Sequence, residues 1–366
     1  MTSVADRQRS LLSPDTRYFE SKDALELESG AVLPGLTLAY RTWGRLDPAA
    51  PDAVLICHAL TGSADADDWW PGMIGDGLAL DPARDFIVCS NVIGGCYGSS
   101  GPLTTAAGGD RRYGGDFPQV TVRDMVQAQR RLLDALGVRR LKLVVGPSLG
   151  GMQVLEWAAT FPERVESIAP IGVSGRHSAW CIGISAAQRE AIYNDPAWQG
   201  GHYSDASPPA QGLAAARMMA MVSYRSFDNL AERFGRGRED SGEFSVESYL
   251  RYQGAKLNGR FDAVSYVRLT EAMDSHDVAR GRGDYPAVLG TIAQPALVVS
   301  VSSDVLYPPR EQRELAEALP NADYRVLESP HGHDGFLIDT AELGFMIKDF
   351  RSKLKVASSS RIAVAN

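Results

Sequence analysis

The sequence has 366 residues, of which 44% are hydrophobic and 22% charged, with 36 glycines and 20 prolines. This composition is that of an ordinary globular protein and excludes collagen-like, coiled-coil and disordered chains. The length suits either two domains or one α/β domain with a large insertion. The net charge of −8 disfavours a nucleic-acid binder, which must neutralise several phosphates.

Cysteine usage and the N-terminal segment indicate in which cellular compartment the protein is expected. The chain has four unevenly spaced cysteines, too few for a disulfide framework, and no C-x-x-C pair suggests a zinc or redox site. The polar segment Met1 to Tyr18 lacks the apolar core of a signal peptide, and no run of 18 apolar residues predicts a membrane span. We therefore expect a cytoplasmic protein without a metal centre.

Strands alternate with helices in the first half of the chain. Short apolar or β-branched runs predict strands, and apolar residues at helical spacing predict helices. Gly137 is placed to end the first helix, and the Phe161-Pro162 step closes the second. The expected elements are strands at Leu36 to Trp43, Ala53 to Cys57, Phe86 to Cys89, Leu141 to Val145 and Ser167 to Ile171, and helices at Val122 to Leu136 and Leu149 to Thr160. This rhythm predicts a doubly wound, mostly parallel sheet.

The alternation stops between Gly175 and Gly290, where helical patches such as Ala186 to Ile192 and Gly212 to Val222 predict a helical insertion. It resumes with a strand at Pro295 to Ser302, a helix at Arg310 to Leu319, a strand at Tyr324 to Leu327 and a helix at Ala341 to Leu354. We therefore expect a sheet-based core formed by residues 1–174 and 291–366, with residues 175–290 as a helical lid.

Residues 146–150, G-P-S-L-G, match the G-x-S-x-G nucleophile elbow. They follow a predicted strand and precede a predicted helix, which is the context that the motif requires. The glycines permit a tight turn that exposes Ser148, and the helix N-terminus directs N–H groups toward a developing oxyanion. A plain strand-to-helix turn is the alternative for the pentapeptide alone.

Two loops flank this elbow in the predicted fold. His58-Ala59-Leu60-Thr61-Gly62 follows a predicted strand, at the place where α/β-hydrolases supply a second oxyanion N–H, so we expect Leu60 and Leu149 to donate together. A structural role for His58 at the strand end stays open. The glycine-rich loop Gly94 to Gly101 lacks the G-K-[ST] ending of a phosphate-binding loop, so we interpret it as a tight turn.

A serine nucleophile on this fold is followed in the chain by an acid and then a histidine. Asp304 comes directly after the strand that ends at Ser302, and only His331 and His333 lie beyond it. Sequence spacing leaves either histidine as the base, and Asp304 taken alone also suits a solvated turn.

These and other stretches resemble the homoserine O-acetyltransferases of the α/β-hydrolase superfamily. The similar stretches are H-A-L-T-G at 58–62, C-S-N-V-I-G-G-C-Y-G-S-S-G-P at 89–102, V-R-D-M-V-x-A-Q at 122–129, G-P-S-L-G-G-M-Q at 146–153, S-S-D-x-L-Y-P at 302–308 and H-G-H-D-G-F-L at 331–337. They span most of the chain, so the resemblance is specific and extends beyond the fold.

The resemblance implies Ser148 as nucleophile, His333 as base and Asp304 as the acid that orients it. It also implies that Arg217, Tyr224 and Asp334 contact the amino-acid substrate. A guanidinium suits a carboxylate and a carboxylate suits an ammonium group, although Arg217 as a solvated side chain and Tyr224 as a core residue are alternatives.

The implied activity is transfer of an acetyl group from acetyl-CoA to the hydroxyl of L-homoserine through an acyl-serine, as a step of methionine biosynthesis, without a metal or redox cofactor. The resemblance also implies a homodimer acting on small molecules. A succinyl donor, L-serine as acceptor, or hydrolysis by a serine esterase or thioesterase are the alternatives. A non-catalytic protein would require the ordered triad to be an accident.

Overall fold

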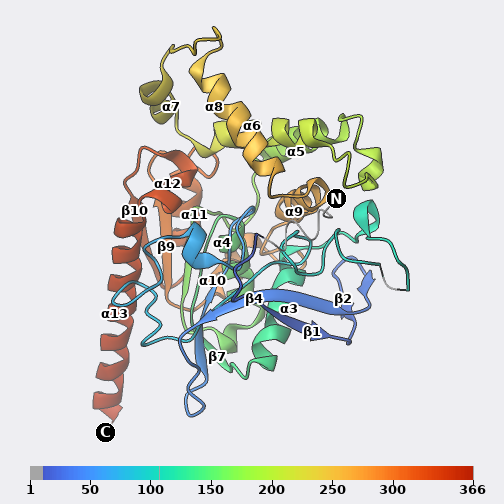
Figure 1. The fold of residues 1–366 in the computed structure, drawn as a ribbon. Helices are drawn as coiled ribbons and strands as arrows, with labels where there is room; N and C mark the ends of the chain where they lie inside the picture. The colour runs from blue at the N-terminus through green and yellow to red at the C-terminus, as the bar shows by residue number, and fades with distance from the viewer. Residues whose placement is uncertain (1–10, 107, 366) are drawn as a thin grey trace.

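The computed structural model describes residues 11–106 and 108–365, with side chains described as far as residue 356. Residues 1–10, which belong to the polar segment considered for a signal peptide, lie outside the described residues, as do residues 107 and 366. Figure 1 shows a central sheet with helices packed against it and a group of helices above it.

Eight strands form the main sheet, in the spatial order β1-β4-β6-β5-β7-β8-β9-β10. Every neighbouring pair from β6 to β10 is parallel, whereas β1 and β4 pair antiparallel at one edge. The expected mostly parallel sheet is therefore confirmed. The strands are β1 (Arg17–Ser21), β4 (Leu36–Trp43), β5 (Asp52–Ile56), β6 (Ile87–Ser90), β7 (Arg140–Pro147), β8 (Ile168–Ile171), β9 (Ala296–Val301) and β10 (Ala322–Leu327), and β2 (Leu25–Glu26) with β3 (Val32–Leu33) forms a small second sheet.

Helices cover both faces of the sheet because the central strands are apolar on both sides. In β5, Leu55 joins one core cluster while its neighbours Val54 and Ile56 join the other, as the alternation of side chains along a strand requires. The first cluster includes apolar side chains of α3 (Val122–Ala135), α4 (Leu149–Thr160) and α11 (Pro309–Ala318). The second includes those of α13 (Thr340–Ala365) and the segment around α2 (Ala66–Trp69).

Local signals fix where these helices begin and end. Thr121 caps α3 in a reciprocal capping box with Asp124, and Gly137 follows the helix at φ +79°, a left-handed conformation that glycine adopts without strain.

In α4 every residue from Leu149 to Ala158 is buried, so the sheet on one side and neighbouring helices on the other hold this helix.

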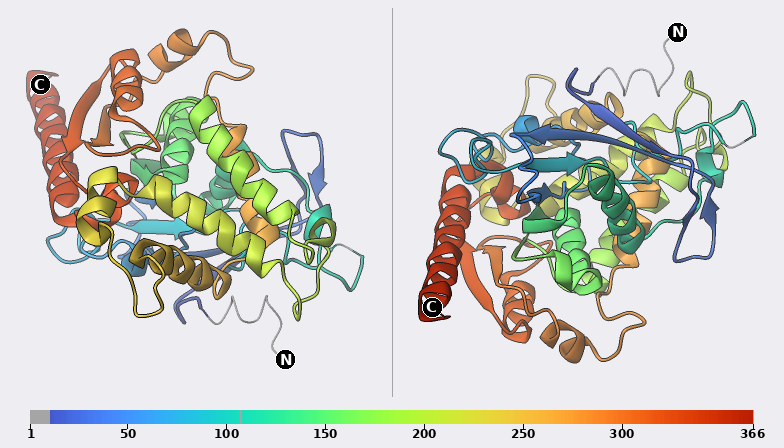
Figure 2. Two further views of the ribbon diagram at one scale, coloured as in Figure 1. Left: turned by 90° about the horizontal axis from the view of Figure 1, so that it is seen from above. Right: turned by 90° about the horizontal axis from the view of Figure 1, so that it is seen from below.

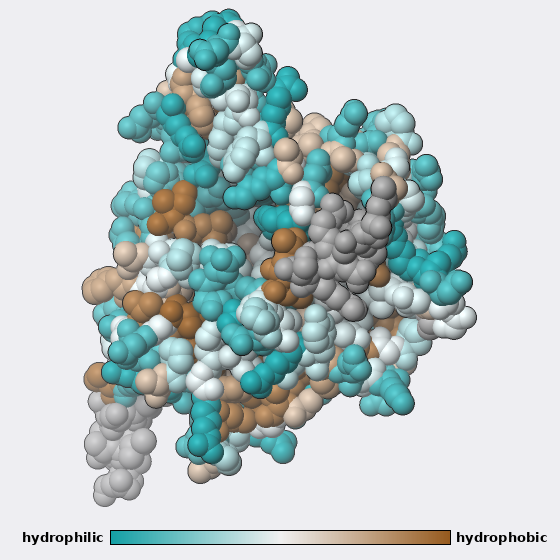
Figure 3. Space-filling model, in the orientation of Figure 1, coloured by the Kyte–Doolittle hydropathy of each residue, from teal (hydrophilic) through white to brown (hydrophobic). Residues whose placement is uncertain are grey.

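The segment between β8 and β9 is helical, and we call residues 175–290 the lid. Its helices lie across the sheet when the molecule is seen from above (Figure 2). Hydrophilic side chains cover most of the face in Figure 3, with smaller hydrophobic patches between them. The helices are α5 (Ala179–Tyr193), α6 (Ala210–Tyr224), α7 (Phe227–Phe234), α8 (Ser245–Asn258), α9 (Ala263–Asp274) and α10 (Tyr285–Gly290).

The predicted elements of the core agree closely with these bounds. The predicted bounds of β4 and α4 are the observed ones, and the other predicted core strands and helices except α13 differ by at most two residues at either end. Strand β1 was missed because Arg17–Ser21 is a short, partly charged edge strand without clear alternation. Helix α13 extends beyond the predicted end at Leu354, and short α12 (Gly335–Ile338) precedes it.

Candidate active site

Ser148 lies on the turn between β7 and α4 with φ 56° and ψ −122°, a backbone conformation that is strained for a residue with a side chain. A Cβ atom at Gly146 or at Gly150 would collide with the carbonyl oxygen of Cys57. The neighbouring loop therefore packs directly against the turn, and glycine is required at both positions. This is the geometry of a nucleophile elbow.

Asp304 and His333 form a buried hydrogen-bonded pair. The distance between Asp304 Oδ2 and His333 Nδ1 is 2.6 Å, and the two residues are 3% and 2% exposed. Asp304 Oδ1 accepts hydrogen bonds from the amides of Leu306 at 2.8 Å and Tyr307 at 2.9 Å. These amides fix the carboxylate, which in turn orients the imidazole, so His333 Nδ1 carries a hydrogen and Nε2 is left as a base.

The ring of His333 lies beside the turn that follows β8, which also contacts the backbone of Ser148. Among residues 11–106 and 108–365, His333 Nε2 is buried and has no hydrogen-bond partner. Gly172 lies beside the ring, since a Cβ there would be 3.5 Å from His333 Cε1, and the Ser148 amide donates to the Ile171 carbonyl at 2.9 Å. The elbow and the histidine thus border one turn, residues 171–172, at the end of β8.

The second late histidine has different surroundings. His331 Nδ1 lies 3.1 Å from Asn229 Nδ2 on α7, so its ring is engaged by the lid. Between the histidines, Gly332 has φ +69°, and a Cβ there would collide with the backbone of Arg225 and Ser226. The structure places only His333 against Asp304, a choice that chain spacing left open.

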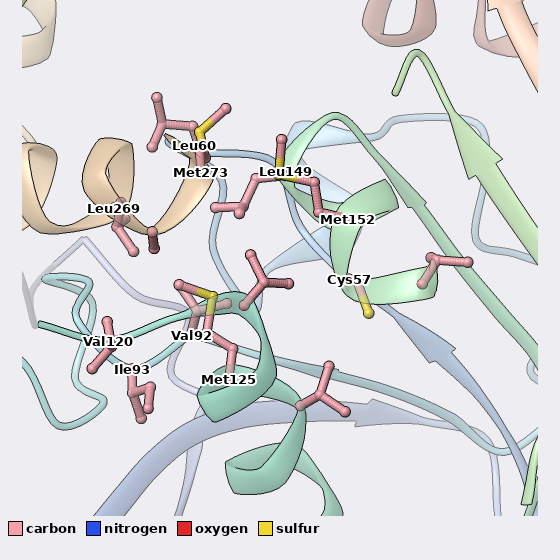
Figure 4. Packing of buried hydrophobic residues seen from close by; sticks show 14 of the residues in the cluster. Cys57, Leu60, Val92, Ile93, Val120, Met125, Leu149, Met152, Leu269 and Met273 are labelled. Carbon is pink, nitrogen blue, oxygen red and sulfur yellow. The ribbon is translucent and has the colours of Figure 1, made fainter. Parts of the chain in front are cut away.

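The two predicted oxyanion donors lie on the elbow and on the loop that packs against it. Leu149 opens α4, so its amide has no carbonyl one turn earlier in the helix with which to bond. Leu60 lies on the loop after β5, a strand that pairs directly with β7, and the side chains of Leu60 and Leu149 belong to one core cluster (Figure 4). The arrangement suits the two donors of an oxyanion hole.

His58 has a structural role in this loop. Its Nδ1 donates to the Ala59 carbonyl at 2.8 Å, and its Nε2 accepts from the Val92 amide at 3.2 Å. Burial lowers the pKa of His58 to about 4, so the ring is neutral, and these two bonds define its tautomer. The alternative that His58 stabilises the end of the strand is therefore supported.

The three predicted substrate contacts converge beside His333. The Tyr224 ring lies 5.8 Å from the His333 ring, and the Arg217 guanidinium carbon lies 5.2 Å from the centre of the Tyr224 ring. Among the described residues, buried Arg217 Nη1 has no acceptor, so the guanidinium is available to an anion. Asp334 follows His333 in the chain, and its pKa is raised by burial against the opposing effect of Arg225 and Arg217.

Sequence reasoning missed Arg225, whose Nη2 lies 3.4 Å from Asp334 Oδ2. Its position next to Tyr224 was the only signal in the sequence. It also missed the cations of a cavity of about 400 Å³ that reaches Arg217 and the loop at residues 61–63. Lys256 and Arg260 line this cavity together with Tyr97 from the glycine-rich loop. These residues lie far apart in the chain, so no motif joins them.

Within the part of the chain that the structure describes, no helix has both the length and the apolar composition needed to cross a membrane.

Comparison with known families agrees with this geometry. The family model described as alpha/beta hydrolase fold matches residues 52–340, so the chain belongs to the α/β-hydrolase class that the sheet and elbow define. A homoserine O-acetyltransferase from Chlorobaculum tepidum is 55% identical over 348 residues, covering 95% of this chain and 98% of the relative. Another from Nostoc punctiforme is 57% identical over 342 residues, covering 92% and 96%. The chain belongs to the homoserine O-acetyltransferase family.

The fold itself is shared with hydrolases. The solved structure of an acetylester hydrolase from Corynebacterium glutamicum has a TM-score of 0.81 with 27% sequence identity, and the match covers 92% of this chain and 96% of that one. The sheet and its catalytic turn therefore do not by themselves separate a transferase from an esterase.

Proposed function

We propose that this protein transfers an acetyl group from acetyl-CoA to the hydroxyl of L-homoserine, with Ser148, His333 and Asp304 as its catalytic triad. The Asp304–His333 pair, in which His333 Nε2 has no partner among the described residues, is the observation that supports the chemistry. Family membership at more than 50% identity supports the choice of substrates.

In the first half-reaction, His333 takes the proton of Ser148 while Oγ attacks the thioester carbon. The amides of Leu60 and Leu149 stabilise the oxyanion of the tetrahedral intermediate. The carbon–sulfur bond then breaks, and the thiolate of CoA takes the proton from His333. The product of this step is an acetyl ester on Ser148.

In the second half-reaction, homoserine binds with its carboxylate on Arg217 and its ammonium group near Asp334, beside Tyr224. His333 removes the proton from the homoserine hydroxyl, whose oxygen attacks the acyl-serine carbon. The ester bond to Ser148 breaks, and Oγ regains the proton. The sum of the two steps uses no metal or redox cofactor, because acetyl-CoA is the co-substrate that supplies the activated acyl group.

The proposal also assigns different roles to the core and to the lid. Residues 1–174 and 291–366 carry the triad, while the lid at residues 175–290 supplies Arg217 and Tyr224 and limits access of water. Exposed apolar side chains on α6 to α8 support a homodimer formed through the lid, namely Met219, Val222, Phe227 and Tyr252. We place the enzyme in the cytoplasm, in methionine biosynthesis.

The test is an assay of the purified protein with acetyl-CoA or succinyl-CoA, combined with L-homoserine, L-serine or no acceptor, following CoA release. We expect a stoichiometric burst with acetyl-CoA alone and a steady rate at least about a hundredfold higher with homoserine, equal to roughly 2.7 kcal/mol at the barrier. The acetyl adduct should appear in the intact mass and be absent from Ser148→Ala.

Three results would contradict the proposal. Steady CoA release that is independent of any hydroxyl amino acid would identify a thioesterase or esterase. Preference for succinyl-CoA or for serine would change the substrates and leave the mechanism intact. An unchanged adduct in Ser148→Ala would remove Ser148 from the mechanism.

A further inference from the structure

The loop at residues 58–62, which we call the oxyanion loop, is held through its carbonyl groups. The His58 carbonyl accepts from Gln153 Nε2 at 3.4 Å, and the Ala59 carbonyl accepts from His58 Nδ1 at 2.8 Å and from the Gly62 amide at 2.9 Å. The Thr61 carbonyl accepts from Arg260 Nη1 at 2.8 Å. Side chains from three parts of the chain therefore set the orientation of its peptide groups.

Arg260 is the only one of these side chains that comes from the lid. It follows α8, 199 residues after Thr61 in the chain, and is half-buried. Its Nη2 donates to Thr61 Oγ1 at 3.2 Å, and its Nη1 also donates to the Tyr97 hydroxyl at 2.8 Å. The guanidinium thus makes a two-pronged contact with Thr61, and Tyr97 of the glycine-rich loop holds it from another direction.

The planarity of the peptide group carries this contact to Leu60. In a trans peptide the C=O and N–H groups point in opposite directions. When Arg260 holds the Thr61 carbonyl, the Gly62 N–H of the same peptide points the other way, toward the Ala59 carbonyl that accepts it. The Ala59 carbonyl and the Leu60 N–H belong to the same peptide. Because the Gly62 amide holds the Ala59 carbonyl, the Leu60 N–H points in the opposite direction, away from Gly62.

We infer that Arg260 is a positioning residue for the oxyanion hole, acting on the Leu60 amide through the Thr61–Gly62 and Ala59–Leu60 peptides. The inference rests on the proposed function, in which Leu60 is one of the two oxyanion donors. It also links the lid to the acylation step, because displacement of the end of α8 would release the Thr61 carbonyl and with it the orientation of the donor.

Binding of substrate by Arg260 is the competing role, since Arg260 lines the cavity that reaches Arg217. Both hydrogens of Nη1 are already used, one by the Thr61 carbonyl and one by the Tyr97 hydroxyl, and Nη2 bonds Thr61 Oγ1. Three of the five N–H donors of Arg260 are thus engaged by Thr61 and Tyr97. Arg217, whose Nη1 has no acceptor among the described residues, is the better ligand for an anion.

The experiment measures single-turnover acylation of Ser148 by acetyl-CoA without homoserine, and by p-nitrophenyl acetate, in the full-length protein. Arg260→Met should lower the acylation rate constant at saturating donor by on the order of a hundredfold, near the effect of losing one oxyanion donor, with the donor concentration at half-maximal rate changed less than twofold. Arg260→Lys retains one donor for the Thr61 carbonyl and should restore at least a tenth of the rate. Arg251→Met on α8, whose exposed side chain bonds Glu243, is the matched control and should leave the rate unchanged.

A role in substrate binding would instead raise the half-saturating concentration and leave the limiting rate unchanged, which would overturn the inference. So would a loss of activity that matches the loss of folded protein, measured as active sites titrated by p-nitrophenyl acetate and as the melting temperature. Failure of the proposed function would be recognised by a different result, namely that homoserine does not stimulate CoA release by the wild-type protein. The p-nitrophenyl acetate measurement still tests Arg260 in that case, because an acyl-serine esterase needs the same oxyanion donors.

Discussion

The turn at residues 146–150 and the lid obtain their geometry in different ways. At the turn, the backbone fixes the site, because Ser148 has a strained φ, glycines 146 and 150 allow direct contact with Cys57, and amides hold Asp304. In the lid, contacts of side chains fix the positions of the residues, since Arg217 lies against Tyr224 and Arg260 bonds to the oxyanion loop. In the proposed mechanism, the residues on and around the sheet carry out acyl transfer, and the lid adds the contacts that select substrates.

This difference predicts that substitutions at the turn affect every reaction of the enzyme, whereas substitutions of the lid residues proposed to bind substrate, such as Arg217, separate one half-reaction from the other. Two predictions test that distinction, and a third concerns the junction between the two regions.

The largest effect is expected at His333, which is hydrogen-bonded to Asp304 and lies beside the turn at Gly172. His333→Ala should lower kcat of the complete reaction by about 10⁴-fold, because it removes the base from both half-reactions. His331→Ala is the matched control and should cost less than about tenfold, since its ring contacts Asn229. Steady-state kinetics with acetyl-CoA and homoserine would measure both, and a reversed order would transfer the role of base to His331.

A smaller and selective effect is expected at Arg217. Arg217→Lys keeps the charge and loses the planar fork, so we expect the homoserine half-reaction to fall by roughly 10- to 100-fold in kcat/KM. Acylation of Ser148 by acetyl-CoA should change less than threefold. The two half-reactions are measured separately, by the CoA burst and by transfer from the isolated acetyl-enzyme to homoserine. Equal losses in both would assign Arg217 to donor binding or to structure.

The smallest effect is expected at the junction of core and lid, and it concerns stability. The His177 amide, near the start of the lid, donates at 2.8 Å to the carbonyl of His276, which lies between α9 and α10. Burial lowers the pKa of His177 to about 4 and that of His276 to about 3, and nearby guanidinium groups add to the effect. The ionised groups around them are Asp274, Glu156, Arg189, Arg123, Arg280 and Arg282.

Both histidines bind a proton more readily in the unfolded chain, so the free energy of unfolding rises with pH between about 3 and 6.5. The contribution of the two neutral histidines to stability is complete above that range. Lowering the pH from 7 to 5 should cost about 2 kcal/mol for each histidine. Urea titrations at several pH values should show a shallower dependence in His276→Gln than in the wild-type protein. His202→Gln, at an exposed position, is the control, and an equal slope in His276→Gln would contradict the assignment.

The alternation of apolar strands with amphipathic or apolar helices was enough to predict the core. Leu36–Trp43 and Leu149–Thr160 form the predicted strand and helix because their burial pattern is encoded locally. Helices α8 and α9 were not delimited in advance. Helix α8 carries Tyr249 and Leu257 in a polar sequence and packs against α6, so its buried face is defined by another lid helix. Helix α9 is mostly buried, and its Leu269 also packs against Gly94 and Gly95 of the core.

The site divides in the same way. The elbow is predictable because G-P-S-L-G encodes a local turn, and Asp304 follows from its place after a core strand. The pairing of Arg225 with Asp334 and the contact of Arg260 with Thr61 join residues more than a hundred positions apart. Arginines are common on solvated helices, so neither was distinguishable from a surface residue before the fold was known.

By itself the sequence determined the fold class and the strand-turn-helix that carries Ser148, and it predicted the order of serine, acid and histidine, because each depends on short-range backbone preferences and on burial patterns that a single segment contains. Chain spacing left His331 and His333 open and the family resemblance implied His333, and the tertiary structure turns the His331 ring toward Asn229 and the His333 ring toward Asp304. The orientation of the oxyanion loop required the tertiary structure. Long-range hydrogen bonds from Gln153 and Arg260 set that orientation, and their geometry exists only when sheet and lid have packed together.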